Sequence, residues 1–131
     1  LGPDVTVVAW WEAGELTTDA GREATAALYR EHPDVTAILC MTDQLAIGAC
    51  QALERLGIDV PGQVSVTGYD DIPRAGTWSP RLTTVHQPLL EKGRIAARML
   101  LDHLGGGADW HQRVELDTEL VIRESTAPAR A

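Results

Sequence analysis

The sequence lacks long hydrophobic runs and dense basic clusters. No stretch of 18 consecutive apolar residues occurs among the 131 residues, so no membrane-spanning helix is expected. The chain has 11 Lys and Arg against 19 Asp and Glu, which gives a formal net charge of -8. Nucleic-acid-binding surfaces need clustered Lys and Arg, and the largest basic group here is Lys92, Arg94 and Arg98. The chain itself is therefore not expected to contact DNA.

Cysteine is scarce, and patterns typical of catalysis or metal binding are missing. Cys40 ends an apolar run and Cys50 lies in a helical pattern, which favours buried free thiols in a reducing compartment over a disulfide. The four histidines form no H-x-x-x-H pair and there is no C-x-x-C pair, so we expect no metal and no cofactor. No G-x-S-x-G motif occurs, and Ser65 and Ser79 have no His or Asp at a recognisable spacing. The chain is therefore not expected to be an enzyme.

The first half of the sequence alternates strand and helix patterns. Residues 5–11 form a continuous apolar run that predicts a strand buried on both faces, and residues 35–41 and 64–69 predict two more strands. Helical patterns lie between them, the first capped by Thr17, Thr18 or Asp19 and the second by Asp43. Strands separated by helices imply right-handed crossovers, so the sequence predicts an α/β fold with a parallel sheet and flanking helices.

The second half has a different pattern. Residues 71–80 are expected to be irregular, and residues 82–87 short and extended. Residues 89–104 have one apolar face and predict a long helix that ends at three consecutive glycines, 105–107. Residues 114–122 alternate between apolar and polar, which predicts a half-buried strand, and residues 125–131 are expected to form a loose tail.

Polar residues follow each of the first three predicted strands. Ligands of open parallel sheets bind beyond the carboxyl ends of the strands, where residues 15–17, 42–43 and 69–71 are expected. Their carboxylates and hydroxyls, beside an apolar wall, suit a small polyhydroxylated or heterocyclic ligand. Asp70 lies at a strand tip and is the preferred contact, whereas Asp43 is more simply explained as a helix cap and Asp71 as a loop-shaping residue. An alternative magnesium site, as in receiver domains, also requires a Lys at the end of a later strand, and none is placed there.

The positions of three residues, Ile47, Gln51 and Trp78, indicate a surface that contacts another protein. A helical projection places Ile47 opposite the core face of its helix, beside Gln51. Trp78 lies in a predicted loop, where a large aromatic is otherwise poorly accounted for. Aromatic residues are enriched in interface cores, so we expect this surface to bind another protein.

Four motifs in order resemble one known family. Residues 37–49 resemble its strand followed by Asn- or Thr-Asp and a helix, and residues 64–71 resemble its S-V-x-G-[FY]-D-D strand. Residues 82–88 resemble its L-T-T-V-x-Q-[PD] crossover, and residues 120–125 resemble its closing L-[VI]-x-R-x-S strand. Together they cover nearly the whole chain, which resembles the C-terminal part of the effector-binding domain of LacI/GalR transcriptional regulators.

The resemblance implies a partial periplasmic-binding-protein-like fold of type I. Residues 1–84 and 113–124 would form the C-terminal lobe, residues 88–104 a helix crossing back to the N-terminal lobe, and residues 125–131 a tail. Most of the N-terminal lobe and a DNA-binding helix-turn-helix head would lie upstream, outside this chain. The protein would be cytoplasmic, with no membrane association.

The resemblance also implies partners and contacts. A small effector, a sugar or a related metabolite, would bind between the lobes, and operator DNA would be bound only through the head. Effector contacts would come from Asp70, Thr42, Leu16 and Gln87. Leu16 stands where an aromatic often stacks on the ligand. A homodimer would form through Ile47, Gln51 and Trp78.

Two alternatives remain open. A sugar-binding protein of a transporter shares this fold, and the upstream sequence would distinguish the two, since one has a signal peptide and the other a helix-turn-helix. The crossover at residues 83–88 favours the regulator. A receiver-like or phosphatase enzyme would require magnesium-dependent phosphorylation or turnover.

Overall fold

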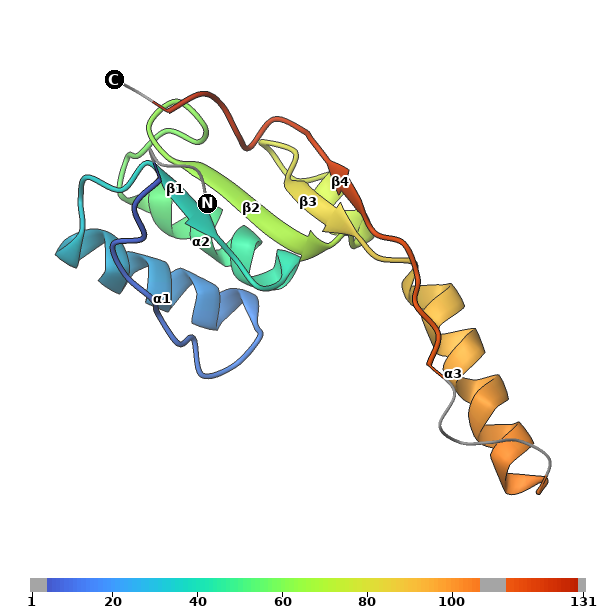
Figure 1. Cartoon of the computed structure of the whole chain (residues 1–131). Helices are drawn as coiled ribbons and strands as arrows, with labels where there is room; N and C mark the ends of the chain where they lie inside the picture. Colours follow the sequence, from blue (N-terminus) through green and yellow to red (C-terminus); the bar gives the residue numbers. More distant parts are fainter. Residues whose placement is uncertain (1–4, 107–112, 130–131) are drawn as a thin grey trace.

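The chain folds around a four-stranded sheet flanked by helices (Figure 1). The computed structural model describes residues 5–106 and 113–129. The sheet order is β1-β2-β3-β4, with β1, β2 and β3 parallel and β4 antiparallel to β3, which confirms the α/β prediction. The elements are α1 (Thr18–Glu31), β1 (Ala37–Leu39), α2 (Asp43–Arg55), β2 (Ser65–Asp70), the 3-10 helix η1 (Pro73–Gly76), β3 (Thr83–His86), α3 (Leu89–Leu104) and β4 (Glu119–Val121).

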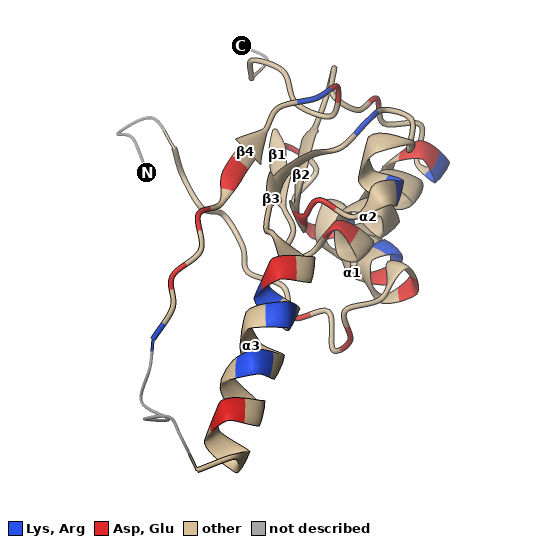
Figure 2. Ribbon diagram, turned by 90° about the vertical axis from the view of Figure 1, so that its right-hand side faces the viewer, with Lys and Arg blue, Asp and Glu red and all other residues tan. Residues whose placement is uncertain are grey.

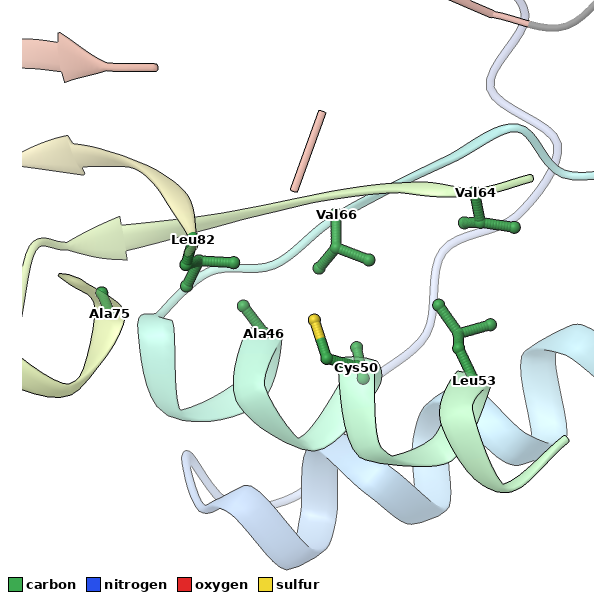
Figure 3. Close-up of a cluster of buried hydrophobic side chains, with 8 residues drawn as sticks. Ala46, Cys50, Leu53, Val64, Val66, Ala75 and Leu82 are labelled. Carbon is green, nitrogen blue, oxygen red and sulfur yellow. The ribbon is translucent and has the colours of Figure 1, made fainter. Parts of the chain in front are cut away.

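The core lies between the sheet and α2. Small and branched side chains of α2 meet side chains that enter from β2 and from the residues that precede β2 and β3 (Figure 3). On its other side α2 packs against α1, where Gly21 and Gly48 let the two backbones approach closely. The helix is therefore enclosed by the sheet on one side and by α1 on the other. The core cluster consists of Ala46, Ala49, Cys50, Leu53, Val64, Val66, Ala75 and Leu82.

Threonines cap both of these helices. Thr17 Oγ1 accepts a hydrogen bond from the Ala20 backbone N–H at 3.2 Å, which identifies the cap among the three candidates for α1. Thr42 Oγ1 accepts from the Leu45 N–H at 3.3 Å, so the expectation that Asp43 caps α2 is wrong. Asp43 is instead the first helical residue, and its carboxylate is fully buried.

The expected strand at residues 5–11 does not form. These residues have no regular structure, and most of them are exposed, with Trp10 88% exposed. An apolar run shows that a segment favours burial, but a strand also needs a hydrogen-bonding neighbour, and within the described residues this segment has none in the sheet. The predicted strand 114–122 is similarly reduced to β4, and the described residues that precede β4 are mostly exposed.

The segment that follows β4 is anchored to the sheet. Ser125 is fully buried; its Oγ donates to the Val66 carbonyl at 2.6 Å and accepts from the Thr83 N–H at 2.8 Å. The Ala127 N–H donates to Ser65 Oγ at 3.1 Å. The expectation of a loose tail is therefore wrong for residues 125–127, while residues 130–131 lie outside the described part.

The helix α3 points away from the sheet (Figure 1). It forms where predicted and ends at Gly105, but none of its residues is buried. Exposed leucines run along it at positions 89, 90, 100, 101 and 104. Among the residues that the structure describes, no helix is long and apolar enough to cross a membrane.

Candidate functional site

The carboxyl ends of β2 and β3 bring two of the predicted contact residues together. Asp70 pairs with His86 in the strand register, which places Gln87 beside Asp70. Gln87 Nε2 donates to Asp70 Oδ1 at 2.5 Å, and Gln87 Oε1 accepts from Lys92 Nζ at 3.2 Å. The side-chain amide of Gln87 therefore binds one oxygen of the Asp70 carboxylate.

The turn after β2 has an uncommon backbone. Asp70 has a φ of 120° and Asp71 a φ of 57°, values that residues with a Cβ rarely adopt. Such conformations cost on the order of 1–3 kcal/mol each and persist only where surrounding contacts hold them. The site thus depends on neighbouring interactions that fix this turn.

The side chain of Asp71 supplies one of those interactions. Its Oδ1 lies 2.6 Å from Arg123 Nη2 and its Oδ2 lies 3.0 Å from His86 Nδ1. Burial opposes ionisation of this carboxyl, but the hydrogen bonds from Arg123 and His86 outweigh it and hold its pKa below the ordinary value. Asp71 is therefore an ion-paired residue that anchors the turn, in agreement with the expectation that it shapes the loop.

Asp43 supplies the second interaction. Its Oδ2 accepts from the Ile72 backbone N–H at 2.8 Å, and its Oδ1 accepts from Thr84 Oγ1 at 2.5 Å. Burial raises the pKa of this carboxyl, and the hydrogen bonds from Thr84 and Ile72 oppose that rise. Gly68 of β2 lies against the same carboxylate, where any Cβ would overlap with Asp43 Oδ1.

The other two predicted contacts lie at the same edge of the sheet. Thr42 directly precedes α2, is half-buried and uses one lone pair of its hydroxyl to cap the helix. Leu16 lies in the turn before α1 and is 64% exposed. Thr18 Oγ1 donates to Gln44 Oε1 at 2.8 Å, so the starts of α1 and α2 are adjacent. Leu16 and Thr42 each lie two residues before this link in the sequence.

Two residues that support the site, and a third that joins the sheet away from it, were not singled out from the sequence. Arg123 and His86 hold Asp71, and Ser125 joins β2 to β3. The L-V-I-R-E-S motif at residues 120–125 contains two of them and was the available signal, since an Arg and a Ser two residues apart on an extended segment point to the same side. His86 had no local signal, because its partner is 15 positions away in the sequence.

The residues predicted to form a dimer surface differ in exposure. Ile47 is 0% exposed, so the expectation that it faces outward is wrong. The helical projection assumed that α2 is buried on one side only. In the structure α2 also packs against α1, and Trp78 in the loop after η1 packs near it. Gln51 is half-buried, and Trp78 packs partly against the core cluster.

A cavity of about 330 Å³ opens beside Trp78. The Trp78 Nε1–H group is buried without a hydrogen-bond partner, and the Arg74 guanidinium lies 5.0 Å from the ring centre. Burial raises the pKa of the adjacent Cys50 thiol to about 12, which disfavours the reactive thiolate. The cavity is lined by Cys50, Glu54, Gly57, Ile58, Asp59, Val60, Trp78, Ser79 and Pro80.

Within residues 5–106 and 113–129, no three His, Cys, Asp or Glu side chains are grouped so that they could hold a metal ion. Cys40 and Cys50 are both free, as expected, and burial raises the pKa of the Cys40 thiol to about 12. The strand-end site is instead a set of hydrogen-bonding groups held in fixed positions.

Comparison with known proteins gives a consistent result. Residues 2–126 match the family of periplasmic binding protein-like domains. The chain is 42% identical over 113 residues to the HTH-type transcriptional regulator MalR of Streptomyces coelicolor, covering 86% of this chain and 32% of MalR. It is 36% identical over 118 residues to the repressor PurR of Proteus mirabilis, covering 90% of this chain and 35% of PurR. The chain thus spans about a third of the length of these curated relatives.

Solved structures agree with this result. A LacI family regulator from Arthrobacter sp. FB24 in complex with lactose is 40% identical with a TM-score of 0.74, over 85% of this chain and 42% of that one. A LacI-type regulator from Bifidobacterium animalis is 34% identical with a TM-score of 0.82, over 89% and 42%. A complex of the regulator CelR with cellobiose is 38% identical with a TM-score of 0.79, over 83% and 33%. The chain therefore belongs to the family of periplasmic binding protein-like domains, and these structurally similar proteins are LacI-family or related transcriptional regulators.

Proposed function

We propose that this chain is the effector-sensing part of a bacterial transcription regulator that binds a sugar or a related polyhydroxylated metabolite. The observation that carries the proposal is the contact between Asp70 and Gln87 at the ends of β2 and β3. A carboxylate accepts hydrogen bonds from vicinal hydroxyls, and an amide can both donate and accept. Relatives solved with lactose and cellobiose support a ligand of this class.

The proposed effector replaces a hydrogen bond between two side chains of the site. Asp70 accepts from Gln87, so a ligand hydroxyl has to displace or share that donor. Thr42 retains its hydroxyl proton for a ligand oxygen, since the oxygen serves as the helix cap. Leu16 offers an exposed apolar surface without an aromatic ring, which suits a contact with the face of a sugar rather than stacking on a base.

The proposed mechanism is a shift between two arrangements of two lobes. Residues 1–84 and 113–124 belong to one lobe, and α3 crosses to the other, which accounts for its exposed leucines. An effector held between the lobes favours the arrangement in which both contact it. That preference changes the affinity for operator DNA, because two ligands of one protein are coupled through the states that they favour.

Operator DNA is bound by a separate part of the proposed regulator. Lys and Arg are interspersed with Asp and Glu across the described residues (Figure 2), and the formal net charge is -8. Such a surface repels a phosphate backbone. The curated relatives are named for a helix-turn-helix, which would supply the DNA contact. A regulator of bacterial DNA acts in the cytoplasm, where we place this one.

The proposed homodimer uses the flank of α2 and the loop after η1. Gln51 and Trp78 remain partly exposed there, whereas Ile47 is fully buried. Trp78 borders the cavity at this surface, and aromatic side chains are enriched in interface cores.

The decisive experiment is Asp70→Asn in the full-length protein, titrated with lactose, cellobiose and ribose by calorimetry. Losing a charged acceptor removes about 1.5–3 kcal/mol, so we expect binding to weaken about tenfold or more with an unchanged melting temperature. Glu23→Gln removes an exposed charge on α1 and serves as the matched control. Equal affinity of the Asp70 variant and the wild type would contradict the site, and no binding of any of the three sugars would contradict the ligand class.

A further inference from the structure

The fully buried carboxylate of Asp43 is not among the proposed effector contacts, yet it joins three segments of the site. We propose that Asp43 is a positioning residue: by binding the Ile72 N–H group and the Thr84 hydroxyl, it fixes the ends of β2 and β3 in the geometry that presents Asp70 and Gln87 to the effector. This inference rests on the proposed function and adds a residue that acts through others.

The first argument concerns the turn. Asp70 and Asp71 both have positive φ, so the turn needs outside support. The next backbone group is the Ile72 N–H, which donates to Asp43 Oδ2 at 2.8 Å. Arg123 and His86 hold the Asp71 side chain. The turn is therefore anchored through its backbone by Asp43 and through a side chain by residues of other segments.

The second argument concerns the two strands beneath the turn. Gly68 and Thr84 are register partners on β2 and β3. The Asp43 carboxylate accepts from the Thr84 hydroxyl and lies in the space that a side chain at position 68 would fill. It thus contacts both strands just before they reach Asp70 and Gln87. Because Thr42 precedes Asp43 in the chain, one carboxylate sets the relative positions of three proposed contacts.

The third argument concerns cost. Burying a carboxylate is unfavourable unless its oxygens are well bound, and both partners of Asp43 are neutral groups. Helix capping does not account for the residue, because Thr42 makes the cap. A carboxylate is suited to this position because its two oxygens accept hydrogen bonds from the turn N–H and the strand hydroxyl at the same time.

The test compares three variants of the full-length protein by calorimetry with lactose. Asp43→Ala leaves the Ile72 N–H without its acceptor, and we expect lactose binding to weaken about tenfold. Asp43→Asn keeps an oxygen for the Ile72 N–H and turns its amide nitrogen toward Thr84 Oγ1. We therefore expect the Asn variant to bind within about threefold of the wild type, which is a rescue by the conservative substitution.

Ser125→Ala is the matched control. Ser125 is also fully buried and also binds both β2 and β3, but at their amino-terminal halves, away from the turn. Its loss should lower the melting temperature about as much as Asp43→Ala while leaving lactose affinity unchanged. Equal weakening by both variants would show a general structural role and overturn the inference, as would wild-type affinity in Asp43→Ala.

Hydrogen–deuterium exchange of the peptide containing residues 70–72 keeps the inference testable if lactose does not bind at all. That result would contradict the proposed ligand class alone. Faster exchange in Asp43→Ala, with wild-type exchange in Ser125→Ala, would still support the positioning role. Unchanged exchange in Asp43→Ala would overturn it.

Discussion

At the scale of single residues, the adjacent carboxylates Asp70 and Asp71 differ through their partners. Asp71 binds a guanidinium and an imidazole, whereas Asp70 meets the neutral amide of Gln87. Both carboxylate oxygens of Asp71 are bound by charged or ionisable side chains, whereas Asp70 has one oxygen bound by an amide. Sequence analysis predicted that both residues lie at the end of a strand and that Asp70 is the ligand contact. It could not identify the partner that distinguishes Asp71 from Asp70, because Arg123 lies 52 positions away in the sequence.

The ion pair of Asp71 predicts how stability depends on pH. Its pKa is lowered in the folded state, so its contribution is present above the ordinary value of 3.8 and is lost as the pH falls further. We expect Arg123→Met to cost about 2 kcal/mol at pH 7 and to flatten the loss of stability in acid, because a partly buried carboxylate loses a charged hydrogen bond.

Urea unfolding at pH 7 and at successively lower pH checks this prediction. Arg81→Met is the control, since Arg81 pairs with Glu124 at 2.9 Å on an exposed surface. We expect little change in that variant, because exposed ion pairs contribute little. A steeper acid transition in Arg123→Met than in the wild type would contradict the assigned role of Asp71.

Other residues show where sequence patterns reach their limit. Ile47 was placed on an outward face because a helical projection assumes one buried side. In the structure α2 is buried on several sides, so Ile47 is a core residue and does not mark an exposed interface. Contacts between Asp43, Ile72 and Thr84 join positions 29 and 41 apart in the sequence, and no local pattern predicts them.

At the scale of elements, the packing of α1 on α2 depends on two glycines. A Cβ at Gly48 would overlap with the Thr18 carbonyl, and one at Gly21 would overlap with Leu45. An alanine in a helix normally stabilises it relative to glycine. Here steric overlap of the two backbones prevails, since α1 must move away to admit a methyl group.

Gly48→Ala is therefore expected to destabilise the chain by about 1–3 kcal/mol, as overpacked cores do. Gly93→Ala in α3 is the matched control, because a Cβ there meets no atom within 4 Å. We expect that variant to gain about 0.5–1 kcal/mol from the helix preference alone. Thermal unfolding followed by circular dichroism measures both, and a stabilised Gly48→Ala would contradict the close approach.

Elements with local signals were the ones predicted well. The helices α1, α2 and α3 and the strands β2 and β3 form at or near their expected positions, because periodicity, caps and glycines act within a few residues. The strand at residues 5–11 was wrong and β4 is shorter than expected. Both depended on a neighbouring strand, and pairing is a long-range property that an apolar or alternating run does not encode.

At the scale of the whole molecule, α3 and residues 5–11 expose apolar surface. The leucines of α3 and the pair Trp10 and Trp11 are all at least 43% exposed. Exposed apolar surface of this kind promotes association. The strand-end site, by contrast, occupies one edge of the sheet and does not use these surfaces.

We expect the isolated 131-residue chain to associate at micromolar concentration. Light scattering should give a mass above that of a monomer, 14.2 kDa. Replacing both Leu100 and Leu104 with Glu should lower that mass, because charges on the apolar face oppose its burial. Arg98→Glu combined with Asp102→Glu, on the same helix, would be the control. A monomeric mass for the unaltered chain would contradict this expectation.

The anchoring of residues 123–127 to the sheet has a consequence for protein synthesis. Asp71 leaves the ribosome 52 residues before Arg123. At about 5–20 residues per second, this interval lasts about 3–10 seconds. During that time β2 and β3 can pair, but Asp71 has no guanidinium and Val66 has no serine hydroxyl. The turn at residues 70–72 and the start of β3 therefore gain their full set of contacts only after the segment beyond β4 has been synthesised.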